Sequence, residues 1–210
     1  MTSKLTLFNG ALRVLGEEQT TLSEEGKARR ELDRAWDEGV VNYCLRQGQW
    51  TFATRTQKLN ASTSIIPDFG LTFAFEKPTD WMATIAVCND PYFKSPIIGY
   101  APETSFIYSD FNEIYVKFTS NDSTYGGDFS LWSESFAEYV HHYLARKTQK
   151  IITQGEQVTE KDLEKSRLIA LNNDRQNKSA QYLPLGSFAS ARLRGGGNRY
   201  YSETGNFPVS

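Results

Sequence analysis

The amino-acid sequence predicts a mixed α+β protein in which a small β-rich domain is inserted into a four-helix domain. Apolar residues recur at helical spacing before residue 50 and again after residue 129. Between these segments apolar and polar residues alternate, and five of the seven prolines lie there. We therefore expect two helices in residues 1–50 and two in 129–180, a mostly antiparallel β domain over 51–128, and an extended C-terminal arm over 181–210.

The two N-terminal helices are predicted from apolar stripes and from end signals. Residues 4–15 carry leucines and a phenylalanine at steps of three and four, and Gly16 follows at the position of a left-handed C-cap. Ser23 is a suitable N-cap for a second, long helix that we expect to end near Gly48. Its apolar stripe consists of Ala28, Leu32, Ala35, Trp36, Val40, Tyr43 and Cys44.

Two large aromatic residues, Trp50 and Phe52, follow directly after this helix. They mark a strand start, a binding pocket or a wedge in the core. In an extended segment, residues two apart point to the same side, so we interpret the pair as a wedge that closes the junction between helices and sheet. The residues that we assign to this structural junction are Trp36, Trp50, Phe52, Pro78 and Trp81.

Strands and then helices are predicted further along the chain. Alternation over residues 71–75, 106–108 and 113–118 favours short strands. Helical spacing returns over 132–151, and Thr159 caps a last helix with Asp162 at its third position.

The C-terminal arm has no periodicity and contains three successive glycines. Either it is disordered or, as its isolated aromatic residues and arginines favour, it is ordered by a partner. The arginines would contact a phosphate backbone or anchor a protein contact. The candidate docking residues are Phe188, Arg192, Arg194, Arg199, Tyr200, Tyr201 and Phe207.

Charge and composition narrow the class of protein. The net charge of −2 argues against a dedicated nucleic-acid binder. Residues 51–128 hold five Lys or Arg against nine Asp or Glu, whereas residues 181–210 hold three Arg against one Glu. No apolar run approaches the roughly 20 residues that span a bilayer, and residues 4–15 are amphipathic rather than a signal peptide. We expect a protein of the cytosol, or one assembled there.

Few residues carry recognisable chemistry. Cys44 and Cys88 match no metal-binding spacing, and we expect two buried free thiols rather than a disulfide. His141 and His142 are adjacent on a helix, so their side chains point about 100° apart and cannot form the i, i+4 pair of helical zinc sites. We expect one of them beside the apolar stripe and the other in solvent. We predict no catalytic residue, metal or cofactor.

Several short motifs follow one another in a characteristic order. LGE (15–17) and TLSE (21–24) precede the long helix, and GQWTFA (48–53) ends it. FEKPTDW (75–81) lies in the β region, and YLA (143–145) lies in the third helix. Over residues 4–180 this order resembles the head-to-tail adaptor proteins of short-tailed bacteriophages, the tail tubular protein A family and its connector relatives. The Trp-x-Phe-Ala and Pro-x-Asp-Trp motifs carry most of the resemblance.

The resemblance implies a structural part of the virion and no enzyme. Such adaptors form a ring, usually of twelve copies, beneath the portal protein, and they provide the platform for the tail nozzle protein. Double-stranded DNA passes through the ring without sequence-specific binding, and no membrane is involved. By analogy, residues 181–210 would be the portal-docking arm. Two alternatives are a virion-associated cell-wall hydrolase and a DNA-binding module.

Overall fold

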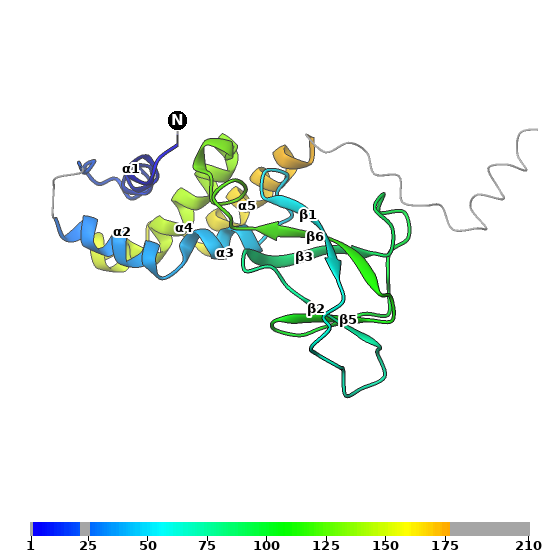
Figure 1. Ribbon diagram of the computed structural model, residues 1–210. Coiled ribbons are helices and arrows are strands. Elements are labelled where there is room, and N and C mark those ends of the chain that lie inside the picture. The colour runs from blue at the N-terminus through cyan, green and yellow to red at the C-terminus, as the bar shows by residue number, and fades with distance from the viewer. Residues whose placement is uncertain (1, 22–25, 177–210) are drawn as a thin grey trace, which may run out of the picture. The chain divides into compact units, whose positions relative to one another are not determined.

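The computed structural model describes residues 2–21 and 26–176, and within them the fold is mixed α+β (Figure 1). Five α-helices, one short 3-10 helix and two small antiparallel sheets make up this part of the chain. The helices are α1 (Lys4–Leu15), α2 (Lys27–Asp37), α3 (Val40–Arg46), η1 (Phe129–Leu131), α4 (Glu134–Ile152) and α5 (Glu160–Gln176). The strands are β1 (Thr54–Asn60), β2 (Phe73–Glu76), β3 (Trp81–Cys88), β4 (Ala101–Pro102), β5 (Phe106–Ser109) and β6 (Glu113–Ser120).

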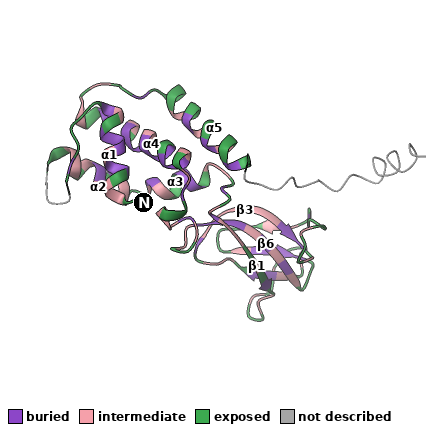
Figure 2. Cartoon of the chain, turned by 90° about the horizontal axis from the view of Figure 1, so that it is seen from above, coloured by how far each residue is buried: buried purple, intermediate pink, exposed green. Residues whose placement is uncertain are grey.

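Helix α4 is the centre of the helical part. Helices α1, α2, α3 and α5 all pack against it, and Figure 2 shows α5 on one side of α4 with α1 and α2 on the other. The buried face of α4 includes Phe136, Val140 and Leu144, which follow one another at steps of four residues. This spacing puts one apolar stripe of α4 into the core that the N-terminal helices also line.

Local capping chemistry fixes several helix ends where the sequence predicts them. Gly16 ends α1 with φ 74°, in the left-handed conformation that a glycine adopts without steric cost. At the start of α5, the Asp162 backbone N–H donates to Thr159 Oγ1 at 3.3 Å, and the Thr159 backbone N–H donates back to Asp162 Oδ2 at 3.1 Å. Both cap predictions are therefore confirmed.

The predicted long second helix is wrong, because Gly39 divides it. Gly39 has φ 88° and ψ 36°, so the chain leaves helical geometry between α2 and α3. The apolar stripe continues across the break, which is why its spacing gave no sign of two helices. The expected N-cap Ser23 lies outside the described residues, and Gly26 stands at the N-cap position of α2. The described residues thus contain five α-helices where the sequence predicted four.

The six strands form two sheets, which we call sheet A and sheet B. Sheet A has the order β1-β6-β3, and sheet B has the order β2-β5-β4, with every neighbouring pair antiparallel. The predicted strands at 106–108 and 113–118 are found as β5 and β6, and the one at 71–75 begins two residues later, as β2. The prediction of a mostly antiparallel β structure is confirmed.

Two separate clusters of buried residues hold the structure together. The helical cluster centres on Phe8, Trp50, Phe136 and Tyr139, each with at most 1% of its surface exposed. The second cluster lies in the β part and includes Phe75, Ile107, Ile114 and Phe118, which are fully buried. The strands therefore pack around a core of their own and do not extend the helical core.

Candidate functional site

Trp50 is a wedge inside the helical core. Its side chain is fully buried, and its ring lies 4.6 Å from the Phe136 ring in an edge-to-face contact. The indole Nε1–H donates to the Cys44 carbonyl at 3.2 Å, so the one polar atom of the side chain has a partner at the end of α3. A side chain without exposed surface offers no contact to a ligand, which excludes the binding-pocket interpretation of Trp50.

Phe52 lies beside Trp50, but the segment between them is a turn and not the start of a strand. The Ala53 backbone N–H donates to the Trp50 carbonyl at 3.2 Å, and β1 begins only at Thr54. The extended conformation that we expected for residues 50–52 is therefore wrong. The two rings nevertheless lie 6.3 Å apart, and Phe52 packs half-buried against the helical cluster.

The other three junction residues are divided between the two cores. Trp36 packs in the helical part, edge-on to Phe129 at 5.6 Å. Trp81 stacks on Phe118 at 4.3 Å in the β cluster, and its backbone N–H donates to the Pro78 carbonyl to form a tight turn. The structure thus does not bring the five predicted residues together at one place.

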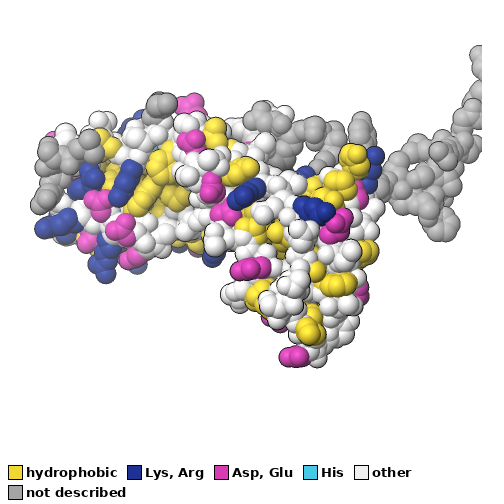
Figure 3. Space-filling model, viewed as in Figure 1, with side chains coloured by type: hydrophobic (Ala, Val, Ile, Leu, Met, Phe, Trp, Pro, Cys, Tyr) yellow, Lys and Arg dark blue, Asp and Glu magenta, His cyan; other side chains and the backbone are white. Residues whose placement is uncertain are grey.

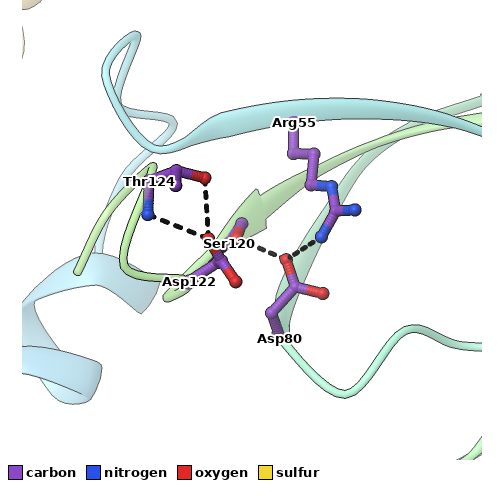
Figure 4. Close-up of polar contacts among 5 residues, drawn as sticks. All are labelled: Arg55, Asp80, Ser120, Asp122 and Thr124. Carbon is purple, nitrogen blue, oxygen red and sulfur yellow. Dashed lines mark hydrogen bonds and ion pairs between the residues drawn. The ribbon is translucent and has the colours of Figure 1, made fainter. Parts of the chain in front are cut away.

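A polar network joins the three strands of sheet A at their end next to the helices. Arg55 Nη1 donates to Asp80 Oδ2 at 2.8 Å, and Ser120 Oγ donates to the same oxygen at 2.5 Å (Figure 4). Asp80 is only 9% exposed and Ser120 is fully buried, whereas the Arg55 side chain is 30% exposed. The aspartate of the Pro-x-Asp-Trp motif therefore binds Arg55 and Ser120, and the sequence did not predict these contacts.

The same network continues into the turn after β6. Asp122 accepts the backbone N–H and the hydroxyl of Thr124 at 2.8 and 2.7 Å, and its own backbone N–H donates to Ser120 Oγ (Figure 4). The hydrogen bonds from Thr124 lower the pKa of the Asp122 carboxyl below its ordinary value. These contacts fix the chain as it returns from the β part to the helices.

Helix α5 is tied to the segment between α3 and β1 by two side chains. The Asp174 carboxylate accepts the Thr51 backbone N–H at 2.9 Å and the Thr51 hydroxyl at 3.0 Å. Arg167 Nη1 donates to the Gln47 carbonyl at 3.1 Å. Because Asp174 is only 4% exposed, its hydrogen bonds are sheltered from water and hold the C-terminal end of α5 in place.

The two histidines lie in different environments, as the sequence predicts. His141 is 8% exposed, and neither ring nitrogen makes a hydrogen bond with the described residues. Burial lowers the pKa of His141 to about 4, so the ring is neutral near pH 7. His142 is half-buried, and its Nδ1 lies 2.9 Å from the Glu138 carbonyl. The pair therefore does not converge on a common ligand.

The two cysteines are core residues in different parts of the fold. Cys44 and Cys88 are both buried free thiols, which confirms the prediction, and burial raises the pKa of each thiol above its ordinary value. Within residues 2–21 and 26–176, no group of three His, Cys, Asp or Glu residues is placed to hold a metal ion. No helix in that part of the chain is long and apolar enough to cross a membrane.

A groove of about 720 Å³ lies between α4 and α5. Side chains in its lining that could carry chemistry make hydrogen bonds within their own helical segments instead. Its lining includes His142, Asp162 and Ser166. Asp162 accepts from the Thr159 hydroxyl at 2.7 Å, and Ser166 Oγ donates to the Leu163 carbonyl at 2.8 Å. Among the described residues, no hydrogen bond joins the serine to the histidine. The arrangement therefore does not have the geometry of a serine nucleophile activated by a base.

The outward face of α5 exposes large apolar side chains. Ser166, Ala170 and Asp174 form its buried stripe, at steps of four residues. Leu168, on the opposite face, is 46% exposed, and Ile169, on the flank of the helix at the α4 groove, is 48% exposed. Charged residues surround them: Glu160, Lys161, Glu164 and Lys165. An apolar centre with a charged rim is the composition that protein contacts favour.

A second exposed apolar feature lies on the far side of α4, in a groove against α2. This groove has a volume of about 230 Å³, and Ile151 in its lining is 40% exposed. At 3.6 residues per turn, Ile151 stands about 180° around α4 from His142, which lines the α5 groove. The charged residues of this groove are Glu31, Arg34, Glu38 and Lys147.

The candidate residues of the C-terminal arm, from Phe188 to Phe207, lie outside the described residues. No known protein-family model matches the chain, and no curated protein is significantly similar to it.

Proposed function

We propose that the chain is a head-to-tail adaptor, a structural virion protein that forms a ring beneath the portal and carries the tail nozzle during assembly and DNA ejection. The ordered motifs between residues 4 and 180 support this proposal. The structural observation that carries it is the pair of exposed apolar faces on opposite sides of α4, one on α5 and one in the groove between α2 and α4.

Two different faces are what a ring protomer needs. A ring is built from head-to-tail contacts, in which a face of one copy meets a different face of the next copy. Leu168 and Ile169 on α5 and Ile151 in the groove between α2 and α4 are the exposed apolar side chains of these two faces. We assign the ring contact to these two faces, with the charged rims setting the register. The number of copies, twelve, follows from the resemblance.

The remaining parts of the chain have distinct roles in this proposal. Helices α2 and α3 act as one helix interrupted at Gly39, so that the helical part works as a four-helix scaffold of the ring. Residues 181–210 dock on the portal through their arginines and aromatic residues. DNA passes through the ring without sequence-specific binding, and the assembled protein belongs to the virion tail, built in the host cytoplasm. Neither a catalytic residue nor a cofactor is needed.

The test is assembly with the purified portal protein, observed by negative-stain electron microscopy. Full-length protein should add a ring to the portal, and protein lacking residues 183–210 should stay folded but fail to dock. Leu168→Glu should dock as single copies without a closed ring, because a charge would be buried in each contact. Ile98→Glu serves as the matched control, since Ile98 is 93% exposed in the β part. A normal ring from Leu168→Glu removes the assigned contact, and absence of any ring on the portal removes the proposed function.

A further inference from the structure

Three loops meet at one end of sheet B. Strand β5 pairs antiparallel with β2 on one side and with β4 on the other. The end of β5 therefore lies beside the starts of both β2 and β4. Consequently the segments before β2, before β4 and after β5, residues 61–72, 97–100 and 110–112, gather at the same end of the sheet.

Each of these loops exposes a large apolar side chain. Ile66 is 85% exposed, Ile98 is 93% exposed, Phe69 is 46% exposed and Phe111 is 42% exposed. We call these four residues the sheet B loop surface. Exposed apolar side chains that gather at one end of a sheet are typical of a protein contact site.

Side-chain contacts hold this surface in place. The Phe69 ring packs edge-on against Tyr108 at 4.9 Å. Asp110 Oδ1 accepts the Thr72 backbone N–H at 3.1 Å and the Thr72 hydroxyl at 3.0 Å. The loop before β2 is thus attached to the turn after β5, and a partner would meet a surface that is already organised.

The charges around this surface have one sign. Residues 61–72, 97–100 and 110–112 contain Asp68 and Asp110 but neither lysine nor arginine. Glu76 and Glu103 lie at the opposite end of sheet B, next to Phe106 at the start of β5. Lys58 in β1 pairs with Glu113, and Lys77 lies at the opposite end of sheet B, where it donates to the Glu103 carbonyl. Figure 3 shows magenta and yellow side chains around and below sheet B on the face in view, and no dark-blue ones.

We propose that the sheet B loop surface is a docking site for a basic protein segment that carries apolar side chains. The carboxylates of Asp68 and Asp110 attract lysine and arginine, and the four apolar residues supply the desolvated contact. The same charges repel nucleic-acid phosphates and anionic lipid headgroups. They also repel an identical surface of a second copy, so the occupant is a different protein. If the chain is the adaptor proposed above, this segment belongs to the tail component that the ring carries.

The experiment uses the full-length chain and a synthetic peptide of alternating lysine and leucine. Hydrogen exchange measured by mass spectrometry should show protection of residues 61–72, 97–100 and 110–112 when the peptide is added. Raised salt should weaken the binding, because exposed charges are screened beyond about 10 Å at 0.1 M. A glutamate–leucine peptide of the same length should give no protection.

Two variants separate the apolar and the charged contributions. Ile66→Ser with Ile98→Ser should weaken binding about tenfold, as expected for removal of contact anchors. Asp68→Asn with Asp110→Asn should weaken it as well and reduce the salt dependence, while the new amide oxygen at position 110 still accepts from Thr72. Leu168→Ser with Ile169→Ser, on α5, is the matched control and should bind as the unaltered chain does.

Several results would overturn the inference: protection elsewhere in the chain, equal binding of the glutamate–leucine peptide, or no effect of either double variant. Protection of the same loops by double-stranded DNA or by vesicles of anionic lipid would replace the basic protein with those partners. The ring assay on the portal is independent of these measurements. A normal ring with no peptide effect removes only this inference, whereas peptide binding that follows the variants without a ring removes only the proposed function.

Discussion

Gly10 is the position where a small change has the most readily calculated effect. It lies in α1 and faces α4, and a Cβ added there would stand 2.4 Å from the Cε1 and Nε2 atoms of His141. Ordinary contacts between such atoms begin near 3.5 Å, so the ring or the helix would have to shift by about 1 Å. We therefore expect Gly10→Ala to destabilise the protein.

The sign of this prediction depends on two opposing terms. In an exposed helix interior, alanine in place of glycine stabilises by about 1 kcal/mol. Overpacking a dense core costs about 1–3 kcal/mol, and His141 is only 8% exposed between the two helices. The steric term is the larger one at so close a contact, and the expected net loss is up to about 2 kcal/mol of unfolding free energy. The His141 ring makes no hydrogen bond with the described residues, so the cost of moving it is a packing cost alone.

A double-mutant cycle measured by urea unfolding tests this reasoning. In the background of His141→Ala the added methyl group has room, and Gly10→Ala should then stabilise by its helix propensity alone, about 1 kcal/mol. The change of sign between the two backgrounds is the expected result. If Gly10→Ala stabilises the unaltered protein, or shifts stability equally in both backgrounds, the steric explanation is refuted.

Four further changes test other contacts by urea or thermal unfolding. Trp50→Ala should cost about 3–5 kcal/mol because the side chain is fully buried, and a loss below about 1 kcal/mol would contradict the wedge. Asp174→Ala should cost about 1–3 kcal/mol, since the hydrogen bonds from Thr51 to a buried carboxylate are lost. Gly39→Ala should cost about 1–2 kcal/mol at φ 88°, and an unchanged midpoint would show that the break tolerates a side chain. Because the pKa of His141 is lowered to about 4, the unfolded chain binds the proton first as pH falls, so stability should decline between about pH 6.5 and pH 4. His141→Ala should flatten that decline, and an equal decline in both proteins would remove His141 as its cause.

The sequence predicted best those features that depend only on residues close together in the chain. The caps at Gly16 and at Thr159 with Asp162 were predicted because their chemistry spans only a few positions. Gly39 was missed because a glycine inside a helical pattern costs only about 1 kcal/mol and gives no sign of its φ. The apolar stripe has the same spacing whether the segment forms one helix or two, so it could not reveal the break.

The sheets show where local patterns stop being sufficient. Strand β6 alternates strongly and was predicted, because its inward side chains line the β core on one face. Strand β1 has Leu59 as its one buried residue, so its sequence has no apolar period to detect. Two sheets instead of one, and the register of each, follow from pairings between residues far apart in the chain.

The candidate site was predicted least well. The network of Arg55, Asp80 and Ser120 joins positions 25 and 40 residues apart, and no spacing rule relates them. The sheet B loop surface likewise depends on three loops that only the strand pairing brings together. No sequence pattern marked Ile98 as exposed, because hydrophobicity alone does not distinguish a buried side chain from a contact anchor.

The first and last residues of the β part are neighbours in space. Thr54 pairs with Thr119, and the Ser120 backbone N–H donates to the Ala53 carbonyl at 2.8 Å. The helical scaffold could therefore be closed across this point by a short glycine linker, with residues 54–119 removed. The same two attachment points would accept an unrelated β module. Recombination at this position would change what the protein contacts while the helices keep their packing around α4.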